Sequence, residues 1–368
     1  MKGLLIGGGV ILGIVLGFWP GGLTKAKPAW WRWLTIISLL VLVYLSLGVP
    51  TGGTFFSART ISMVRTDDPK LPILGKIVTM PSGDGPMMLE DRQGTRGTAF
   101  VPPDLVTGRG LKAGDEVILN ASFSRADSAF HADRVVAVNP MLALPLIPGL
   151  EERARNLYYH VPSAWLSQVA WFVAFYFAIV YLRKRRPEDD IRASSAAAIG
   201  ALFCILATVT GAIWAKFNWG EFWNWDPRQI SIFVVLIIYG AYFALRSALP
   251  NEDQRSRFSA VYLVLLALPV LFFLFVFPRM VHGSLHPGSL DDPNIGPVLS
   301  PQADALDFLK QVIFGLSMFG FSLLFFWMLN VTVRTKLLEL RRERRAVARE
   351  ERSSASTTAI DKGVIRLN

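Results

Sequence analysis

Residues that can bind a metal or an acidic cofactor are concentrated in three short segments of the chain. The first segment contains His160, and the last contains His282 and His286. The segment between them carries rings, a glycine and two charges: Trp219, Gly220, Trp223, Trp225, Asp226 and Arg228. Imidazole nitrogens ligate transition metals, and a guanidinium group pairs with carboxylates. Together these residue types predict a site for a flat, acidic ligand that contains a metal.

A porphyrin is the ligand whose chemistry these residues match. It is an apolar plate with two carboxylates on one edge, and its iron takes one imidazole on each face. Tryptophan rings supply apolar area, and Gly220 permits close approach. Histidines at the ends of separate helices can reach opposite faces of one plate. Three arginines are candidate partners of the carboxylates: Arg155, Arg228 and Arg279.

The alternative for the tryptophans is the aromatic belt of a membrane protein, in which Trp and Tyr anchor at headgroup level. Composition alone favours this belt. A belt fixes depth and requires no order, whereas Trp219 to Arg228 forms the ordered string Trp-Gly-x-x-Trp-x-Trp-Asp with an arginine two residues later. For each histidine taken singly, the alternative is a hydrogen-bonding role at a helix end.

The composition indicates that the bilayer is the solvent of this chain. Of its 368 residues, 52% are hydrophobic and 18% are charged, which is too apolar for a soluble protein of this length. The single cysteine, Cys204, excludes an internal disulfide, and without a Cys-x-x-Cys-His motif the chain does not attach haem to itself by thioether bonds. The net charge of +10 lies beside apolar stretches, so it indicates membrane orientation and not a nucleic-acid partner.

Seven apolar stretches predict an all-α polytopic membrane protein, since a spanning helix needs about 20 residues. They begin near Leu4, Leu34, Trp165, Ala196, Ile230, Ala260 and Phe308. The first is interpreted as a helix and not a signal peptide, because no small-residue cleavage site follows Pro20. Alternate short loops and the segment after the last stretch are basic: Lys25, Lys27, Arg32, Arg183, Lys184, Arg185, Arg186, Arg246, Arg255, Arg257, Arg341, Arg342, Arg344 and Arg345. The positive-inside rule then predicts an outward N-terminus, a cytoplasmic C-terminus and an outward position for all three candidate segments.

Residues 51–140 predict a small all-β domain inserted on the outward side. Five runs rich in β-branched and apolar residues are separated by turn sequences: Ile73–Met80, Met87–Asp91, Thr98–Val101, Glu116–Phe123 and His131–Val138. Five short strands suggest a barrel of the OB type. The other divisions are two N-terminal helices in residues 1–50, a main membrane unit in residues 141–335, and a charged cytoplasmic tail in residues 336–368. We expect the tail helix to break at the serine- and threonine-rich run that begins at Ser353.

The ordered tryptophan string resembles the WWD-domain haem-handling proteins of cytochrome c maturation, the CcmC/CcmF/CcsA superfamily, and within it the CcmC type. The family loop Trp-Gly-x-x-Trp-x-Trp-Asp is matched in register from Trp219 to Asp226. The arginine and serine that follow it in the CcmC type are matched by Arg228 and Ser231. The resemblance covers roughly residues 150–333.

Two further motifs of the CcmC type flank this loop. Tyr-x-His-Val-Pro-Ser-Ala-Trp is matched from Tyr158 to Trp165, and Leu-His is matched by Leu285 and His286. The resemblance implies that His160 and His286 are the axial ligands of a non-covalently bound haem b, with the tryptophan loop as its platform. His282 has no counterpart in the family pattern.

The chain departs from the CcmC pattern at two places. Pro227 follows the aspartate, as in the haem-lyase and synthetase branches of the superfamily, and Gln229-Ile230 replaces the usual Leu-Thr. Against those branches, the chain is too short for the large lyase type and lacks its additional histidines.

The inserted domain resembles the CcmE-type haem chaperone of the same pathway in its last strand, Phe-x-Ala-Asp-x-Val-Leu-Ala-Lys-His. Here that strand is Phe130–Asn139, preceded by a similar turn at Leu111–Asp115. Asn139 occupies the position of the haem-binding histidine, and Ala143 that of a tyrosine four residues further on. An amide cannot replace imidazole in that bond, so we expect no covalent haem here. The domain is either a dock or lid beside the haem platform or a structural insertion.

These features predict a haem-handling protein of the inner membrane with its haem site and β domain on the periplasmic side. It shows no nucleophile–base pair, paired carboxylates or phosphate loop, so we expect haem binding and transfer without bond chemistry. The resemblance implies delivery of haem to a CcmE-type chaperone and ABC-transporter subunits as partners. One alternative is a cytochrome c synthetase or haem-lyase component, which Pro227 and the outward domain favour. The other is a small-solute transporter, which requires more polar residues within the spans.

Overall fold

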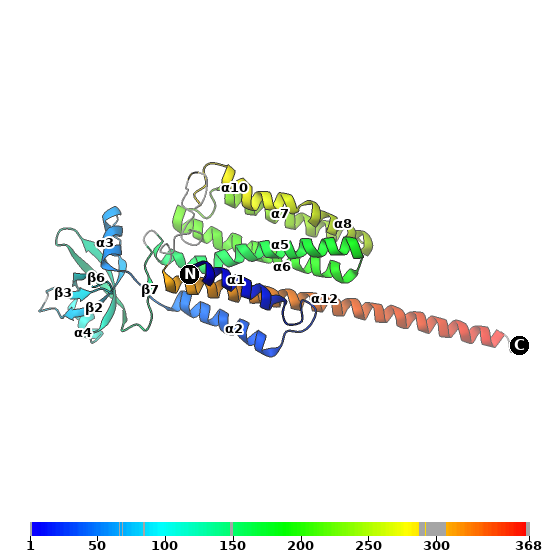
Figure 1. Cartoon of the computed structure of the whole chain (residues 1–368), viewed down its shortest axis with the longest axis horizontal. Coiled ribbons are helices and arrows are strands. Elements are labelled where there is room, and N and C mark those ends of the chain that lie inside the picture. Colours follow the sequence, from blue (N-terminus) through cyan, green and yellow to red (C-terminus); the bar gives the residue numbers. More distant parts are fainter. Residues whose placement is uncertain are drawn as a thin grey trace.

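The computed structural model describes residues 2–65, 67, 69–83, 85–147, 150–286, 291 and 307–365 of the chain. Figure 1 shows three parts in a row, which are a small barrel, a bundle of helices and one helix that projects beyond the bundle. The N-terminus lies at the end of the bundle that faces the barrel, and the C-terminus lies at the tip of the projecting helix. We call these two ends of the bundle the barrel end and the tail end.

The bundle contains helices of very different length. They are α1 (Lys2–Phe18), α2 (Ala29–Val43) with a π-helical turn at Tyr44–Gly48, a 3₁₀ turn at Glu151–Asn156, α5 (Leu157–Lys184), α6 (Pro187–Trp219), α7 (Pro227–Ala248), α8 (Glu252–Leu265), α9 (Ala267–Leu271), a π-helical turn at Phe272–Val276, α10 (Phe277–Met280) and α12 (Phe308–Ile365).

The helices confirm the prediction of a membrane protein, whereas the count of seven spans stays a prediction. Within the described residues, five helices are long and apolar enough to cross a membrane. A sixth span results if α8 and its continuation through α10, bent by 41°, count as one. The first predicted span is present as α1, but this apolar helix is shorter than the others. All seven apolar stretches are therefore helical, and five or six of them have the length of a span.

Small residues allow the helices of the bundle to approach closely. A Cβ atom on Gly9 of α1 would lie 2.3 Å from the carbonyl oxygen of Gly315 in α12, so these two backbones are in direct contact. Close approach increases van der Waals contact, which holds helices together where lipid removes the hydrophobic driving force. Alanines do the same between α5 and α6, where several are fully buried: Ala170, Ala174, Ala178, Ala196 and Ala197.

The predicted β domain is a closed five-stranded barrel. Its strands are β2 (Leu71–Thr79), β3 (Met87–Glu90), β4 (Arg96–Phe100), β5 (Glu116–Ser124) and β6 (Ala129–Val138), joined in the order β2-β3-β4-β6-β5. Each predicted run matches its strand to within two residues. Two short helices, α3 (Phe55–Val64) and α4 (Pro103–Gly108), were not predicted. The OB class of this barrel stays a prediction.

The two ends of the inserted domain meet where it joins the bundle. Strand β1 (Thr51–Gly52) pairs in parallel with β7 (Leu144–Pro145). Arg155, in the 3₁₀ turn before α5, donates hydrogen bonds to the carbonyl oxygens of Ser46 and Val49 at 2.5 and 2.9 Å. The joint thus links the end of α2, the barrel and the start of α5 through the pairing of β1 with β7 and the guanidinium of Arg155.

The tail differs from the prediction. Helix α12 continues without a break through Ser353 as far as Ile365, whereas we expected the helix to end at the serine- and threonine-rich run. Serine and threonine lower helix stability by only a few tenths of a kcal/mol each relative to alanine. Without a proline in the run, this cost does not end a helix that is already formed.

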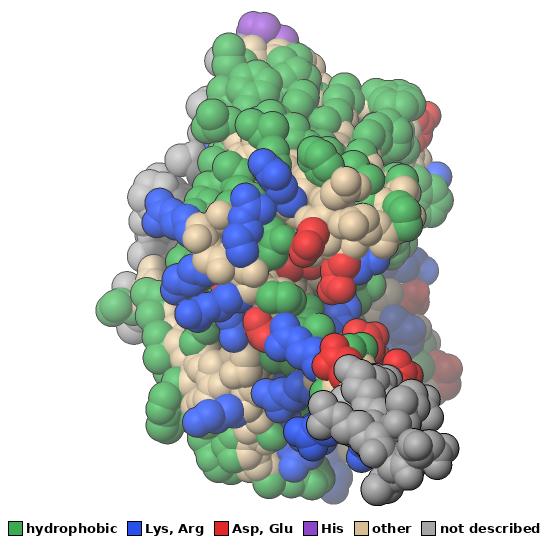
Figure 2. Space-filling view, turned by 90° about the vertical axis from the view of Figure 1, so that its right-hand side faces the viewer, with side chains coloured by type: hydrophobic (Ala, Val, Ile, Leu, Met, Phe, Trp, Pro, Cys, Tyr) green, Lys and Arg blue, Asp and Glu red, His purple; other side chains and the backbone are tan. Residues whose placement is uncertain are grey.

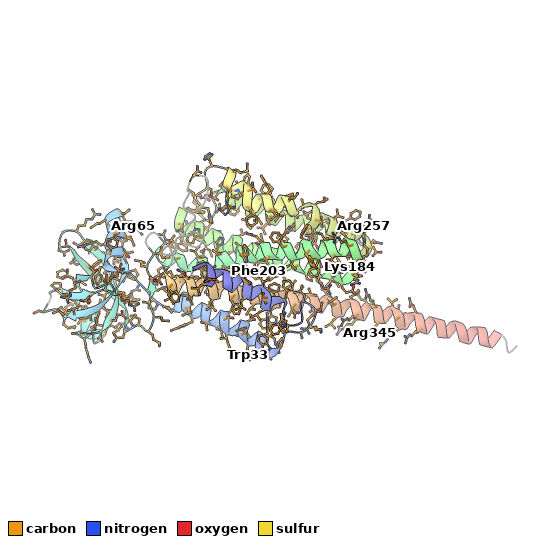
Figure 3. The ribbon with its side chains drawn as sticks, viewed as in Figure 1. Trp33, Arg65, Lys184, Phe203, Arg257 and Arg345 are labelled. Carbon is orange, nitrogen blue, oxygen red and sulfur yellow. The ribbon has the colours of Figure 1, made fainter. Side chains whose placement is uncertain are left out.

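Basic side chains gather at the tail end of the bundle. Figure 2 views the molecule from that side and shows many lysine and arginine side chains over the bundle end. Figure 3 places Lys184 and Arg257 at this end and Arg345 on the projecting part of α12. The loops that the sequence assigns to one side of the membrane are therefore together in space.

Candidate functional site

The tryptophan loop connects α6 to α7 at the barrel end. Helix α6 ends at Trp219 and is followed by Gly220, whose φ of +88° is a left-handed conformation that suits glycine and turns the chain. The indole rings of Trp223 and Trp225 meet edge to face, with centroids 5.7 Å apart, and both rings lie 6.3 Å from that of Phe233. The Trp225 side chain is 63% exposed. The Trp225 ring is thus supported by Trp223 and Phe233 and remains largely exposed.

Asp226 holds this loop to the loop that contains His286. Its side chain caps α7 by accepting a hydrogen bond of 2.8 Å from the backbone N–H of Arg228. It also accepts bonds from the Ser284 hydroxyl at 3.3 Å and from the Leu285 N–H at 2.7 Å. Asp226 is only 3% exposed, so these bonds are well shielded from water. The carboxylate therefore fixes the segment immediately before His286.

His286 continues this hydrogen-bonded turn. Its backbone N–H donates to the Ser284 hydroxyl at 3.3 Å, and its side chain is half-buried. Pro287, the last residue of the sequence segment, lies outside the described residues. The structure thus brings the Leu-His motif against the Trp-Asp motif, although 59 residues separate Asp226 from Leu285.

His160 lies in the first turn of α5 and faces α6. Its Nδ1 atom is 3.1 Å from the carbonyl oxygen of Ala207 and 3.1 Å from the Thr210 hydroxyl. A carbonyl oxygen can only accept, so Nδ1 carries the proton. A Cβ atom on Gly211 would be 2.9 Å from Cε1 of the same ring, so α6 leaves just enough room for the imidazole. None of the described residues hydrogen-bonds Nε2, which is therefore the nitrogen available to a metal.

The start of α5 is tied to the end of α6 by two further bonds. Asn156 donates from Nδ2 to the carbonyl oxygen of Thr210 at 2.8 Å, and Arg153 donates to that of Phe217 at 3.0 Å. Phe217 is two residues before Trp219. The segment with His160 is therefore tied to the part of α6 that leads into the tryptophan loop.

Two arginines lie close together beside the loop. Arg228, in the first turn of α7, is near enough to Arg279 for the two charges to interact. The Nε atom of Arg228 is buried and has no hydrogen-bond partner within the described part of the chain. Arg279 donates from one nitrogen to the Phe275 carbonyl oxygen at 2.6 Å. A pair of like charges with unused donors matches the requirements of a ligand that bears carboxylates.

Three other candidates from the sequence have different surroundings. Arg155 is occupied by the joint described above, so we no longer consider it a partner for a ligand. His282 is exposed and hydrogen-bonds Asp291 at 2.6 Å, which is the main cause of the lowered pKa of that carboxyl group. His131 lies on the barrel, stacked on the Phe100 ring at 5.0 Å and paired with a nearby aspartate. The described residues contain no cluster of three or more metal-ligating side chains.

Sequence reasoning missed three residues of the site, which are Gly211, Phe233 and Ser284. A glycine in the interior of a helix costs about 1 kcal/mol relative to alanine, which indicates a packing reason and was the available signal for Gly211. The supporting roles of Phe233 and Ser284 depend on contacts between loops. No local pattern predicts such contacts.

A family model described as heme exporter protein C matches residues 137–348, which is more than half of the chain. The chain belongs to the heme exporter protein C family. The match begins at the last two residues of the barrel strand β6 and contains α5 to α10, the tryptophan loop and the bundle part of α12. The rest of the barrel and the two N-terminal helices lie outside it.

Relatives with the name heme exporter protein C resemble the same region. The Paracoccus denitrificans protein is 30% identical over 199 residues, which are 54% of this chain and 78% of the relative. The Rhodobacter capsulatus protein is 30% identical over 215 residues, which are 56% and 81%. The Bradyrhizobium diazoefficiens protein is 37% identical over 105 residues, but this stretch spans only 28% of this chain and 40% of the relative. A ccmC-like mitochondrial protein of Marchantia polymorpha, named for cytochrome c biosynthesis, is 35% identical over 113 residues, 31% of this chain and 49% of the relative.

Proposed function

We propose that this member of the heme exporter protein C family binds haem at its outer face and yields it to a haem chaperone during the biogenesis of c-type cytochromes. The contact between Asp226 and the Leu285 N–H supports this most directly. It makes the aromatic loop and the segment of His286 one structural unit, which a mere aromatic belt does not require.

His160 and His286 are the proposed axial ligands. A metal-ligating histidine usually donates its second ring N–H to a carbonyl or carboxylate, which fixes the ring and its tautomer. The bond from His160 Nδ1 to the Ala207 carbonyl has this form and leaves Nε2 for the iron. His286 would supply the second imidazole from the opposite loop.

The remaining residues fit the edges and faces of a porphyrin. The exposed rings of Trp225 and Phe222 offer an apolar surface, with Phe222 57% exposed. Arg228 and Arg279 would pair with the two propionates, and the unpartnered Nε of Arg228 would gain an acceptor. Haem bound here would be the cargo that is transferred, and the protein residues would bind and orient it.

The proposed membrane orientation follows from charge. The basic tail end faces the cytoplasm under the positive-inside rule, so the barrel end, with the haem site and the barrel, faces the periplasm of an inner membrane. Haem held there would be accessible to a periplasmic chaperone of the CcmE type. ABC-transporter subunits are the proposed source of energy for release.

A cytochrome c synthetase is the second candidate, favoured by Pro227 and by the barrel at the same end. The barrel itself is a poor covalent carrier, because Asn139 uses both amide atoms in the barrel. Its Oδ1 accepts from the Glu116 N–H and its Nδ2 donates to Asp115, both at 2.9 Å. Crosslinking from the barrel to an apocytochrome Cys-x-x-Cys-His peptide would favour the synthetase, and crosslinking to a chaperone would favour transfer.

A visible spectrum of the purified protein tests the haem assignment. We expect a Soret band that weakens or shifts in both His160→Ala and His286→Ala. The matched controls are His131→Ala and His282→Ala, which should leave it unchanged. Colourless protein from a haem-replete host, or a band that neither axial substitution alters, would refute the proposal.

A further inference from the structure

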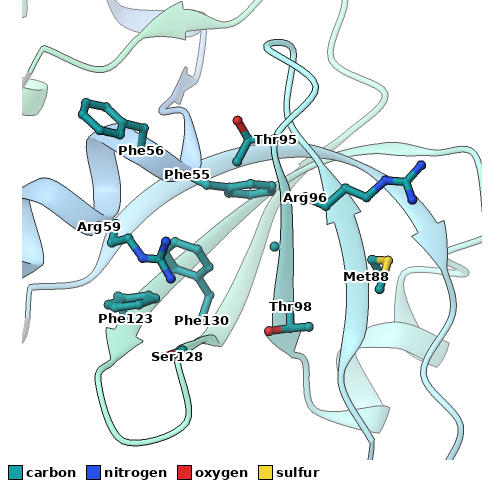
Figure 4. A pocket seen from close by; sticks show the side chains of 11 residues that line it. Phe55, Phe56, Arg59, Met88, Thr95, Arg96, Thr98, Phe123, Ser128 and Phe130 are labelled. Carbon is teal, nitrogen blue, oxygen red and sulfur yellow. The ribbon is translucent and has the colours of Figure 1, made fainter.

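A groove on the barrel lies outside the haem site and is not used by the function proposed above. It is located between helix α3 and strand β4, as Figure 4 shows, and has a volume of about 280 Å³. Pockets that enclose small-molecule ligands span roughly 300–1,000 Å³, so this volume is at their lower limit. It is large enough for one or two apolar side chains, while the rest of a bound chain would lie outside.

The floor of the groove is aromatic. The rings of Phe55, Phe123 and Phe130 pack on one another, with centroids of Phe55 and Phe123 at 5.5 and 5.1 Å from that of Phe130. Each of these three side chains is buried in the barrel core, so the floor is rigid. Phe56, at the rim, is by contrast 70% exposed. A rigid apolar floor with an exposed ring at its edge is typical of the centre of a protein interface.

The charge of the groove is positive. The guanidinium of Arg59 lies over the Phe123 ring at 4.8 Å, and Figure 4 shows it above the aromatic floor. Among the described residues, Arg59 has no carboxylate partner. Arg96 is on the opposite rim, directed away from the floor and paired with Glu90 at 2.9 Å. Among the residues of the barrel that the structure describes, no aspartate or glutamate lines the groove. The Arg59 guanidinium therefore keeps N–H donors that can hydrogen-bond to a carboxylate of a ligand.

One strand edge borders the groove. Strand β4 pairs with β3 along Arg96 to Ala99, but it pairs with β6 only through Ala99 and Phe100. On the side of the groove, the first residues of β4 therefore have no neighbouring strand in the described barrel. An edge of this kind accepts an extended peptide as an additional strand, and pockets beside it select the side chains.

We propose that this groove binds an extended segment of another protein that carries an apolar anchor side chain next to an acidic residue. The anchor occupies the space above Phe55 and Phe130. The carboxylate pairs with Arg59, and the backbone lies along the first part of β4. The volume, the unpaired guanidinium and the open strand edge each support this one occupant.

A peptide selection tests the proposal on the full chain in detergent. A random heptapeptide library displayed on phage is selected on the wild-type protein and counter-selected on Arg59→Ala. We expect enrichment of sequences with one aromatic or aliphatic anchor beside Asp or Glu. Failure to enrich any sequence that Arg59→Ala loses, or enrichment of neutral or basic sequences, would overturn the proposal.

Affinity measurements then test the role of the charge. For a labelled synthetic peptide with the selected sequence, we expect Arg59→Ala to weaken binding at least tenfold and Arg59→Lys to weaken it less. Replacing the acidic residue of the peptide by its amide should have the effect of Arg59→Ala. Arg109→Ala, which alters an exposed arginine of the barrel outside the groove, is the matched control and should not change binding. Equal binding of the acidic and amide peptides, or loss of binding in the control, would overturn the proposal.

Discussion

The Asp226 carboxylate accepts a hydrogen bond of 2.7 Å from the backbone N–H of Leu285, the residue that precedes His286. The same carboxylate caps α7 through the N–H of Arg228. One buried side chain thus carries out two tasks, which are the start of a helix and the position of a proposed ligand loop. The Arg228 and Leu285 N–H groups donate to different oxygens of the carboxylate, so substitutions can separate these two bonds.

Replacing Asp226 by asparagine should impair haem binding more than folding. The amide oxygen can still cap α7, but an NH₂ group then faces the Leu285 N–H, and this buried donor loses its acceptor. Such a loss costs about 1–3 kcal/mol and destabilises the position of the loop that contains His286. We expect a reduced haem content per protein in Asp226→Asn and, in Asp226→Ala, an additional loss of about 1 kcal/mol of stability from the missing cap. Pyridine haemochromogen assays and thermal melting in detergent measure the two effects. Equal haem content in Asp226→Asn and the wild type would refute the positioning role.

Gly211→Ala should displace His160 without weakening helix α6. Alanine favours a helix by about 1 kcal/mol over glycine, so stability alone should not decrease. The added Cβ would lie 2.9 Å from the His160 ring, so the imidazole must move. We expect a weaker or shifted Soret band at an unchanged or higher melting temperature. Gly240→Ala in α7 is the matched control, because a Cβ there meets no atom within 4 Å. A normal spectrum in Gly211→Ala would argue against His160 as a ligand.

Much of the architecture follows from local sequence patterns, and the site follows only in part. Apolar runs are sufficient to identify α5, α6 and α7. In lipid the backbone groups of such a run must hydrogen-bond to one another, so the run forms a helix. Runs of β-branched and apolar residues, separated by turn chemistry, likewise predict the barrel strands. The helix α3 was missed because Phe55–Val64 is short: Phe55, Ala58 and Ile61 are buried at helical spacing, but over only a few turns, and their burial depends on the barrel beneath the helix. The contact of Asp226 with Leu285 joins residues that are distant in sequence, so only the folded chain reveals it. The role of Arg155 at the joint has the same origin.

The neighbouring charges of Arg228 and Arg279 should favour haem binding, whereas they should destabilise the haem-free protein. Two neighbouring cations repel each other until an anion lies between them. We expect Arg279→Gln to leave the haem-free protein at least as stable as the wild type, while haem dissociates about tenfold faster, which corresponds to about 1.4 kcal/mol. Transfer of haem to apomyoglobin measures this rate. Arg257→Gln, an exposed arginine at the tail end, is the control. A large loss of stability in haem-free Arg279→Gln would instead indicate a structural role.

The buried ion pair of Asp190 and Arg246 should stabilise the tail end without affecting the haem site. Two hydrogen bonds of 2.8 and 2.9 Å join the pair, and the Ser256 hydroxyl donates to the same carboxylate at 2.9 Å, so α6, α7 and α8 meet here. Removing one partner leaves an uncompensated buried charge, which costs about 3–5 kcal/mol. Asp190→Ala should therefore lower the melting temperature strongly, whereas Asp190→Leu combined with Arg246→Met should restore most of the loss. In both variants the folded protein should keep the wild-type Soret band.

The double variant also tests the transporter alternative. A transporter that used this pair to move a solute would lose its function in the stable double variant, whereas haem transfer at the opposite end should persist. Haem delivery that is abolished in the stable double variant would show that the tail end takes part in release.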